Sequence, residues 1–193
     1  PRSPYLLSHM FGKAIIFELL LLLFAWLVAG LFSIPLWGED KWNWLGFALG
    51  ITSTLPMLSM FFWLLQSKWE PNRKISQMMD EAVLPLFRDF TILQIALLSI
   101  AAGISEEVLF RAVIQGGLQS ASGTPIAVAI SALLFGVCHA LTKFYFILAT
   151  LMGVYLSLVW MSTSQLLSPM IAHALYDFIV LVWYLRLRVK PND

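Results

Sequence analysis

The chain is poor in charge, since only 12% of its 193 residues are Asp, Glu, Lys or Arg, about half the share found in ordinary soluble domains. Hydrophobic residues make up 60% of it, and its mean hydropathy is +0.82. This composition excludes a soluble globular domain and predicts an integral membrane protein with the lipid bilayer as its surroundings. The net charge of +1 gives no reason to expect a nucleic-acid partner.

Cysteine is nearly absent too, because Cys138 is the only one, and an intrachain disulfide is therefore excluded. The sequence has no internal repeat of the kind that marks many transporters, and no segment reads as a soluble domain. We therefore expect a single transmembrane domain over residues 1–193. Ser8-His9-Met10 resembles a cloning scar, which predicts that residues 1–9 are foreign to the native protein.

Six apolar segments approach the length of about 20 residues that a bilayer requires. They predict an all-α, polytopic bundle of about six transmembrane helices, with its motif-bearing core at about 91–187. The fourth segment is short, and its merging with the fifth is the alternative. The six segments are Ala14–Leu36, Trp44–Leu65, Thr91–Leu118, Pro125–Leu141, Phe144–Met161 and Leu166–Leu187.

Lys and Arg are unevenly distributed between the loops of such a six-span arrangement. Positively charged loops stay in the cytoplasm, and ten such residues fall on one side, whereas the other side has Lys41 alone. Both termini are therefore predicted to be cytoplasmic. The ten are Arg2, Lys13, Lys68, Arg73, Lys74, Arg88, Lys143, Arg186, Arg188 and Lys190.

The longest polar connection runs from Ser67 to Phe90. Its apolar residues recur at helical spacing, which favours an amphipathic helix lying on the membrane surface, interrupted near Pro85. A structured loop is the alternative. The residues expected on the apolar face are Met78, Met79, Val83, Leu84 and Phe87.

The third apolar segment contains three charged residues, Glu106, Glu107 and Arg111. Each charge within a membrane costs roughly 2.5–3.5 kcal/mol on insertion scales, so such residues need partners and usually have a task. Glu107 and Arg111 are four residues apart and can pair on one helix face. Glu106 is rotated by about 100° and is left for another partner. The simpler interpretation is that both acids neutralise one buried arginine for packing.

Two later segments each contribute a histidine. His139 follows Ala132 and Gly136, which with Ala140 form a stripe of small residues that allows close helix approach. His173 and Asp177 are four residues apart, so the carboxyl can orient the imidazole. Counted along the expected helices, Glu106, His139 and His173 fall at similar depth, which predicts a polar site inside the membrane.

The segments SEEVLFR, FGVCH and HALYD resemble the EExxxR, FxxxH and HxxxN/D motifs of the CAAX protease and bacteriocin-processing family. These intramembrane proteases are also called type II CAAX prenyl endopeptidases. The resemblance covers about Ile104–Asp177 and implies that Glu106 and His139 activate water, with Glu107 and Arg111 in support. His173 and Asp177 match the oxyanion-stabilising positions.

Asp177 departs from the Asn familiar in this family, so it must either be protonated to donate a hydrogen bond or orient His173 instead. The short chain suggests a prokaryotic member in an inner or plasma membrane. A peptide or protein substrate is implied, either prenylated or a peptide precursor.

The chemistry leaves alternatives open. Glu106, His139 and His173 could bind a catalytic zinc, but the sequence contains no HExxH, and we expect metal-free, glutamate-dependent hydrolysis without a cofactor. A non-catalytic immunity or scaffold protein would keep the same fold. A small transporter using these groups as an ion or proton relay is the third interpretation.

Overall fold

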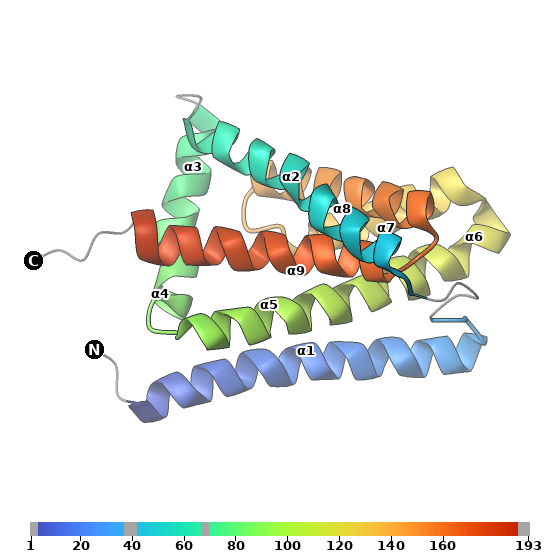
Figure 1. The fold of residues 1–193 in the computed structure, drawn as a ribbon, viewed down its shortest axis with the longest axis horizontal. Coiled ribbons are helices and arrows are strands. Elements are labelled where there is room, and N and C mark those ends of the chain that lie inside the picture. Colours follow the sequence, from blue (N-terminus) through green and yellow to red (C-terminus); the bar gives the residue numbers. More distant parts are fainter. Residues whose placement is uncertain (1–3, 37–41, 67–69, 189–193) are drawn as a thin grey trace, which may run out of the picture.

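The computed structural model describes residues 4–36, 42–66 and 70–188, and every regular element in these ranges is helical (Figure 1). The predicted all-α class is therefore confirmed. The elements are α1 (Pro4–Phe32), α2 (Trp44–Gln66), α3 (Glu70–Met78), the π-helix η1 (Met79–Val83), α4 (Leu84–Phe87), α5 (Ile92–Glu107), the π-helix η2 (Val108–Gly116), α6 (Gly117–Ser122), α7 (Thr124–Cys138), α8 (Lys143–Thr163), α9 (Leu167–Val182) and the π-helix η3 (Trp183–Arg188).

Within the described ranges, five helices are long and apolar enough to cross a membrane. The fourth predicted segment is shorter than expected, because α7 has 15 residues and reaches only about 22 Å at 1.5 Å per residue. It does not merge with α8, so that alternative was wrong. The five long helices are His9–Phe32, Trp44–Gln66, Ile92–Ser122, Lys143–Thr163 and Leu167–Arg186.

The long helices pack side by side, with α9 between α2 and α5, and with α1 along the outer side of α5 (Figure 1). α7 packs against α8 and η2. One buried cluster joins α1, η2 and α7 around Val108, Phe110 and Phe135. This packing holds η2, which follows the acidic pair, at the centre of the bundle.

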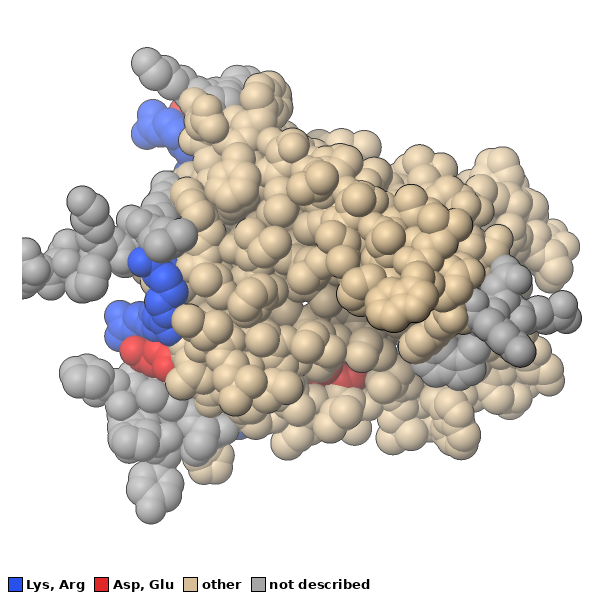
Figure 2. Space-filling view, in the orientation of Figure 1, with Lys and Arg blue, Asp and Glu red and all other residues tan. Residues whose placement is uncertain are grey.

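Lys and Arg side chains gather at one end of the bundle, while its middle and other end are nearly free of them in this view (Figure 2). The first helix begins and the last helix ends at that same end of the bundle (Figure 1). The uneven distribution expected from the sequence is therefore visible on the surface. Arg2, Lys41, Lys68 and Lys190 lie outside the described residues.

The polar connection forms a helical segment, α3–η1–α4, that crosses this end of the bundle (Figure 1). The α-helix is interrupted near Pro85, as expected: a π turn precedes the proline, and the Leu84 N–H bonds to the Met79 carbonyl. Proline has no N–H for the usual bond to the carbonyl four residues back, and the wider π turn accommodates this. Met78 and Met79 are buried against Phe61, Val180 and Tyr184.

Small residues bring α7 and α8 into close contact, as the stripe predicted. A Cβ on Gly153 would lie 3.0 Å from the Ala132 Cα, and one on Gly136 would lie 3.0 Å from the Phe146 carbonyl oxygen. Ala140 was wrongly included in the stripe, because α7 ends at Cys138 and Ala140 is exposed. The close approach of α7 and α8 therefore depends on Ala132, Gly136 and Gly153.

We expect Gly153→Leu to lower the free energy of unfolding by about 1–3 kcal/mol, since the new side chain would be forced into the Ala132 backbone. Gly30→Leu is the matched control, because nothing lies within 4 Å of a Cβ built there. Thermal unfolding of both variants in the same detergent is the measurement. Equal melting temperatures for the two would contradict this account of the α7–α8 contact.

Candidate active site

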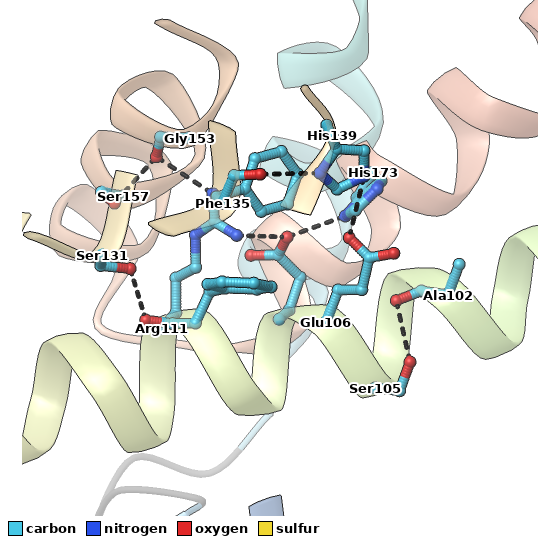
Figure 3. Close-up of polar contacts among 12 residues, drawn as sticks. Ala102, Ser105, Glu106, Arg111, Ser131, Phe135, His139, Gly153, Ser157 and His173 are labelled. Atoms are coloured by element: carbon cyan, nitrogen blue, oxygen red, sulfur yellow. Dashed lines mark hydrogen bonds and ion pairs between the residues drawn. The ribbon is translucent and has the colours of Figure 1, made fainter. Parts of the chain in front are cut away.

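The two adjacent glutamates lie at the end of α5, where the α-helix becomes the π-helix η2. The start of α5 is fixed by a capping box, in which the Gln94 N–H donates to Thr91 Oγ1 at 3.2 Å and the Thr91 N–H donates to Gln94 Oε1 at 2.9 Å. Neighbouring helix residues point in different directions. Glu106 accordingly faces His139 (Figure 3), whereas Glu107 pairs with Arg111 and His173.

Glu107 and Arg111 form the predicted ion pair, with Arg111 Nη1 2.9 Å from Glu107 Oε1 and both side chains 0% exposed. Arg111 Nη2 also donates to the Gly153 carbonyl at 3.0 Å. Its guanidinium carbon lies 4.8 Å from the centre of the Phe135 ring. One side chain from η2 thus contacts both α7 and α8.

His173 lies closer to Glu107 than to the aspartate that was expected to orient it. Its Nδ1 is 2.8 Å from Glu107 Oε1, whereas its Nε2 is 3.5 Å from Asp177 Oδ2. Since Glu107 is paired with Arg111 and accepts hydrogen bonds as a carboxylate, Nδ1 of His173 donates. The sequence did not predict this contact, because it joins residues 66 apart on two packed helices.

His139 caps the C-terminus of α7 and faces Glu106, with its Nε2 3.6 Å from Glu106 Oε2. Its Nδ1 lies 2.8 Å from the Phe135 carbonyl oxygen (Figure 3). A carbonyl can only accept, so Nδ1 carries the hydrogen and a neutral ring presents the lone pair of Nε2 to Glu106. The ring also stacks on Phe135, with centroids 4.4 Å apart.

These groups line a cavity of about 470 Å³, the inner cavity, whose walls are otherwise mostly apolar. The predicted convergence of three helices is confirmed, because Glu106, His139, His173 and Asp177 all line it. Acidic atoms are visible in the otherwise uncharged middle of the bundle (Figure 2). Glu107 and Arg111 lie behind this wall and hold it in place.

Glu18 is an additional acidic residue in this cavity, for which the sequence suggested no role. It lies on α1 and is buried, and the Ser105 hydroxyl donates to its Oε2 at 2.6 Å. The signal that singled out Glu106, one acid within a long apolar run, applies equally to Glu18. Ser105 precedes Glu106 directly, so this bond ties α1 to the acidic turn.

Among the described residues, no group of three His, Cys, Asp or Glu side chains is arranged to hold a metal ion. The zinc alternative requires His173 to join Glu106 and His139. Both nitrogens of His173, however, face carboxylates on other positions, Glu107 and Asp177.

Comparison with known proteins picks out the same part of the chain. Residues 88–179 match the family model described as type II CAAX prenyl endopeptidase Rce1-like. This segment is Rce1-like. All six charged and histidine residues of the three motifs lie inside the Rce1-like segment, which confirms the resemblance, whereas Glu18 lies outside it.

A relative in Bacillus subtilis (strain 168), named "Putative membrane peptidase YdiL", is 32% identical over 93 residues. The matched part covers 48% of this chain and 38% of that relative, so the chain spans well under two thirds of the relative's length. No solved structure matches. The Rce1-like segment thus includes α5, η2, α7 and most of α9, the elements that form the acidic and histidine walls of the inner cavity.

We expect Arg111→Ala to lower the free energy of unfolding by about 3–5 kcal/mol, because it leaves Glu107 as an unpaired buried charge. Arg73→Ala is the control, since its pair with Glu70 is 78% and 64% exposed and should contribute at most about 1 kcal/mol. Purified yield and melting temperature are the measurements. A fully stable but inactive Arg111→Ala protein would instead give the arginine a direct part in the chemistry.

Proposed function

We propose that this protein is an intramembrane endopeptidase in which Glu106 and His139 together activate a water molecule. The observation that carries the proposal is the pair of acceptors facing each other across 3.6 Å. Nε2 of His139 presents a lone pair, and Glu106 Oε2 is buried without a hydrogen-bond partner. A distance of 3.6 Å leaves no room for an atom on the line that joins the two acceptors, but a water on the cavity side of the pair can donate one hydrogen to each.

A water held in this way directs its oxygen lone pairs away from both bases and toward a bound carbonyl carbon. In the proposed reaction Glu106 accepts the proton as the water oxygen bonds to that carbon, giving a tetrahedral oxyanion. The C–N bond then breaks, and the proton passes from Glu106 to the leaving amine. His139 shares the proton and orients the water. Its Nδ1 donates to the Phe135 carbonyl, and this bond keeps the Nε2 lone pair directed at the water.

The oxyanion needs a hydrogen-bond donor, and His173 is the group we assign to this role. Its Nδ1 donates to Glu107. When the ring is doubly protonated, as an imidazolium, its Nε2 can also donate toward the inner cavity. Asp177 flanks that nitrogen at 3.5 Å and balances the imidazolium charge as a carboxylate, or donates itself when protonated. In this proposal Glu107 orients His173, which is one of the two roles that the sequence left open for Asp177.

The proposed reaction needs no metal or other cofactor. What supports this is the position of His173, whose two nitrogens are directed at Glu107 and Asp177, leaving Glu106 and His139 as a two-residue pair. A catalytic zinc is usually bound by three protein ligands. The pair is suited to general-base catalysis, which needs one acceptor and one orienting group.

We propose a membrane-associated peptide or protein as the substrate, cut beside the membrane or near its C-terminus. The inner cavity extends to Ile75 and Met79 of the helical segment that crosses the Lys- and Arg-rich end. Since positively charged ends face the cytoplasm, we place both termini and the entrance of the cavity on the cytoplasmic side. A non-catalytic scaffold would not need an imidazole lone pair and an unpartnered carboxylate oxygen side by side on the cavity wall.

Glu106→Gln and His139→Ala should each lower the rate of hydrolysis by about 100- to 10,000-fold, since each removes a proton acceptor. Purified proteins are incubated with a library of prenylated and unprenylated peptides, and products are identified by mass spectrometry. Cys138→Ala, a change at an exposed neighbour of His139, is the control and should cleave like wild type. Near-normal rates in either acceptor variant would refute the assignment.

Exhaustive treatment with a strong chelator should leave hydrolysis unchanged, and elemental analysis should find far less than one zinc per chain. The reason is that Glu106 and His139 supply the base themselves. Stoichiometric zinc, together with activity that is lost on chelation and restored by zinc, would establish the metal mechanism in its place.

A further inference from the structure

A second cavity, the outer cavity, lies at the end of the bundle and has a volume of about 520 Å³. It is polar, and its walls include Glu70, Arg73, Lys74, Asp80 and Glu81 of α3 and η1. Leu65 and Asn72 line both the outer and the inner cavity. Asn72 therefore lies where the two cavities adjoin.

Asn72 has no partner for either atom of its side-chain amide. It is only 5% exposed, and both Nδ2 and Oδ1 are buried without a hydrogen bond. Buried amides are nearly always hydrogen-bonded, so an exception calls for an explanation. Packing alone does not provide one, because leucine would fill a similar volume without a desolvated polar group.

Ser99 on α5 repeats this pattern deeper in the inner cavity. It is 2% exposed, its Oγ is buried and unpartnered, and it lines the cavity on the same helix face as Ala102 and Glu106. Ser99 and Glu106 are seven positions apart in the sequence, which corresponds to about 10 Å along the helix axis. An extended peptide covers that distance with about three residues.

Building on the proposed function, we propose that Asn72 is a substrate-positioning residue that hydrogen-bonds one peptide group of an extended segment running from the outer cavity to Glu106. An amide matches this ligand because a peptide group offers one donor and one acceptor. A carboxylate would satisfy Nδ2 and leave Oδ1 unpaired. Ser99 binds the same segment nearer the scissile bond.

This assignment defines the class of substrate. Its polar portion occupies the outer cavity among the charged side chains of α3 and η1, and an apolar stretch of at least about three extended residues lies along Ser99 and Ala102. The apolar walls contributed by Met57, Met79 and Leu98 suit such a stretch. The peptide therefore enters from the Lys- and Arg-rich end and threads past Asn72.

Binding can be measured apart from cleavage in the Glu106→Gln protein, using the library peptide that it retains most strongly, labelled for fluorescence anisotropy. Asn72→Leu in this background should raise Kd by roughly 5- to 10-fold, the effect of losing a net hydrogen bond or two. Gln115→Met is the matched control, because Gln115 is a second fully buried, unpartnered amide that lines neither cavity. Its Kd should stay unchanged.

Backbone N-methylation of the peptide, one position at a time, separates a direct contact from a structural role. One position should weaken binding to the Asn72-containing protein by a similar factor and have no effect in Asn72→Leu. An unchanged Kd in Asn72→Leu, equal sensitivity of both proteins to every N-methyl group, or no peptide binding at all would overturn the proposal. Peptide binding that depends on Asn72 without any cleavage by wild type would refute the endopeptidase function alone.

Discussion

The buried ion pair between Glu107 and Arg111 is the interaction on which the rest of the site depends. A guanidinium buried within a membrane bundle must be neutralised. Glu107 supplies the charge and the Gly153 carbonyl takes a second N–H. Because the same carboxylate oxygen also accepts from His173, one pair connects η2 with α8 and α9. Gly153 allows this, since a side chain there would push α7 away.

The two adjacent glutamates have different surroundings, because neighbouring side chains on a helix point in different directions. Glu107 is fully enclosed and is bonded to both Arg111 and His173, so it is a positioning residue. Glu106 faces the inner cavity with one oxygen unpartnered, and it is the acid to which we assign the chemistry. In the proposed mechanism the ion pair of Glu107 keeps the helices packed while Glu106 takes up and releases a proton.

Local spacing was sufficient to predict the pair of Glu107 with Arg111 within one helix, and the face of α7, at Ala132 and Gly136, that a neighbouring helix approaches. It could not predict which residues of two different helices meet. The bond from His173 to Glu107 depends on how α9 rotates against α5, which no spacing within either segment encodes. The interruption of the helix near Pro85 was predicted, but its form, a π turn before the proline, was not. The assigned catalytic roles were suggested by the motifs and remain predictions.

The early end of α7, at Cys138, has a direct chemical consequence. In a continuing α-helix the His139 N–H would bond to the Phe135 carbonyl, four residues back. Here the helix ends, and that N–H bonds to the Gly136 carbonyl at 3.1 Å instead. The Phe135 carbonyl oxygen is therefore free to accept from His139 Nδ1, which fixes the tautomer and turns Nε2 toward Glu106. A full-length span would have used this acceptor for the helix itself. The apolar environment reinforces the arrangement, because a carbonyl freed in the membrane must find a donor, and it finds one in the His139 ring that the proposed chemistry uses.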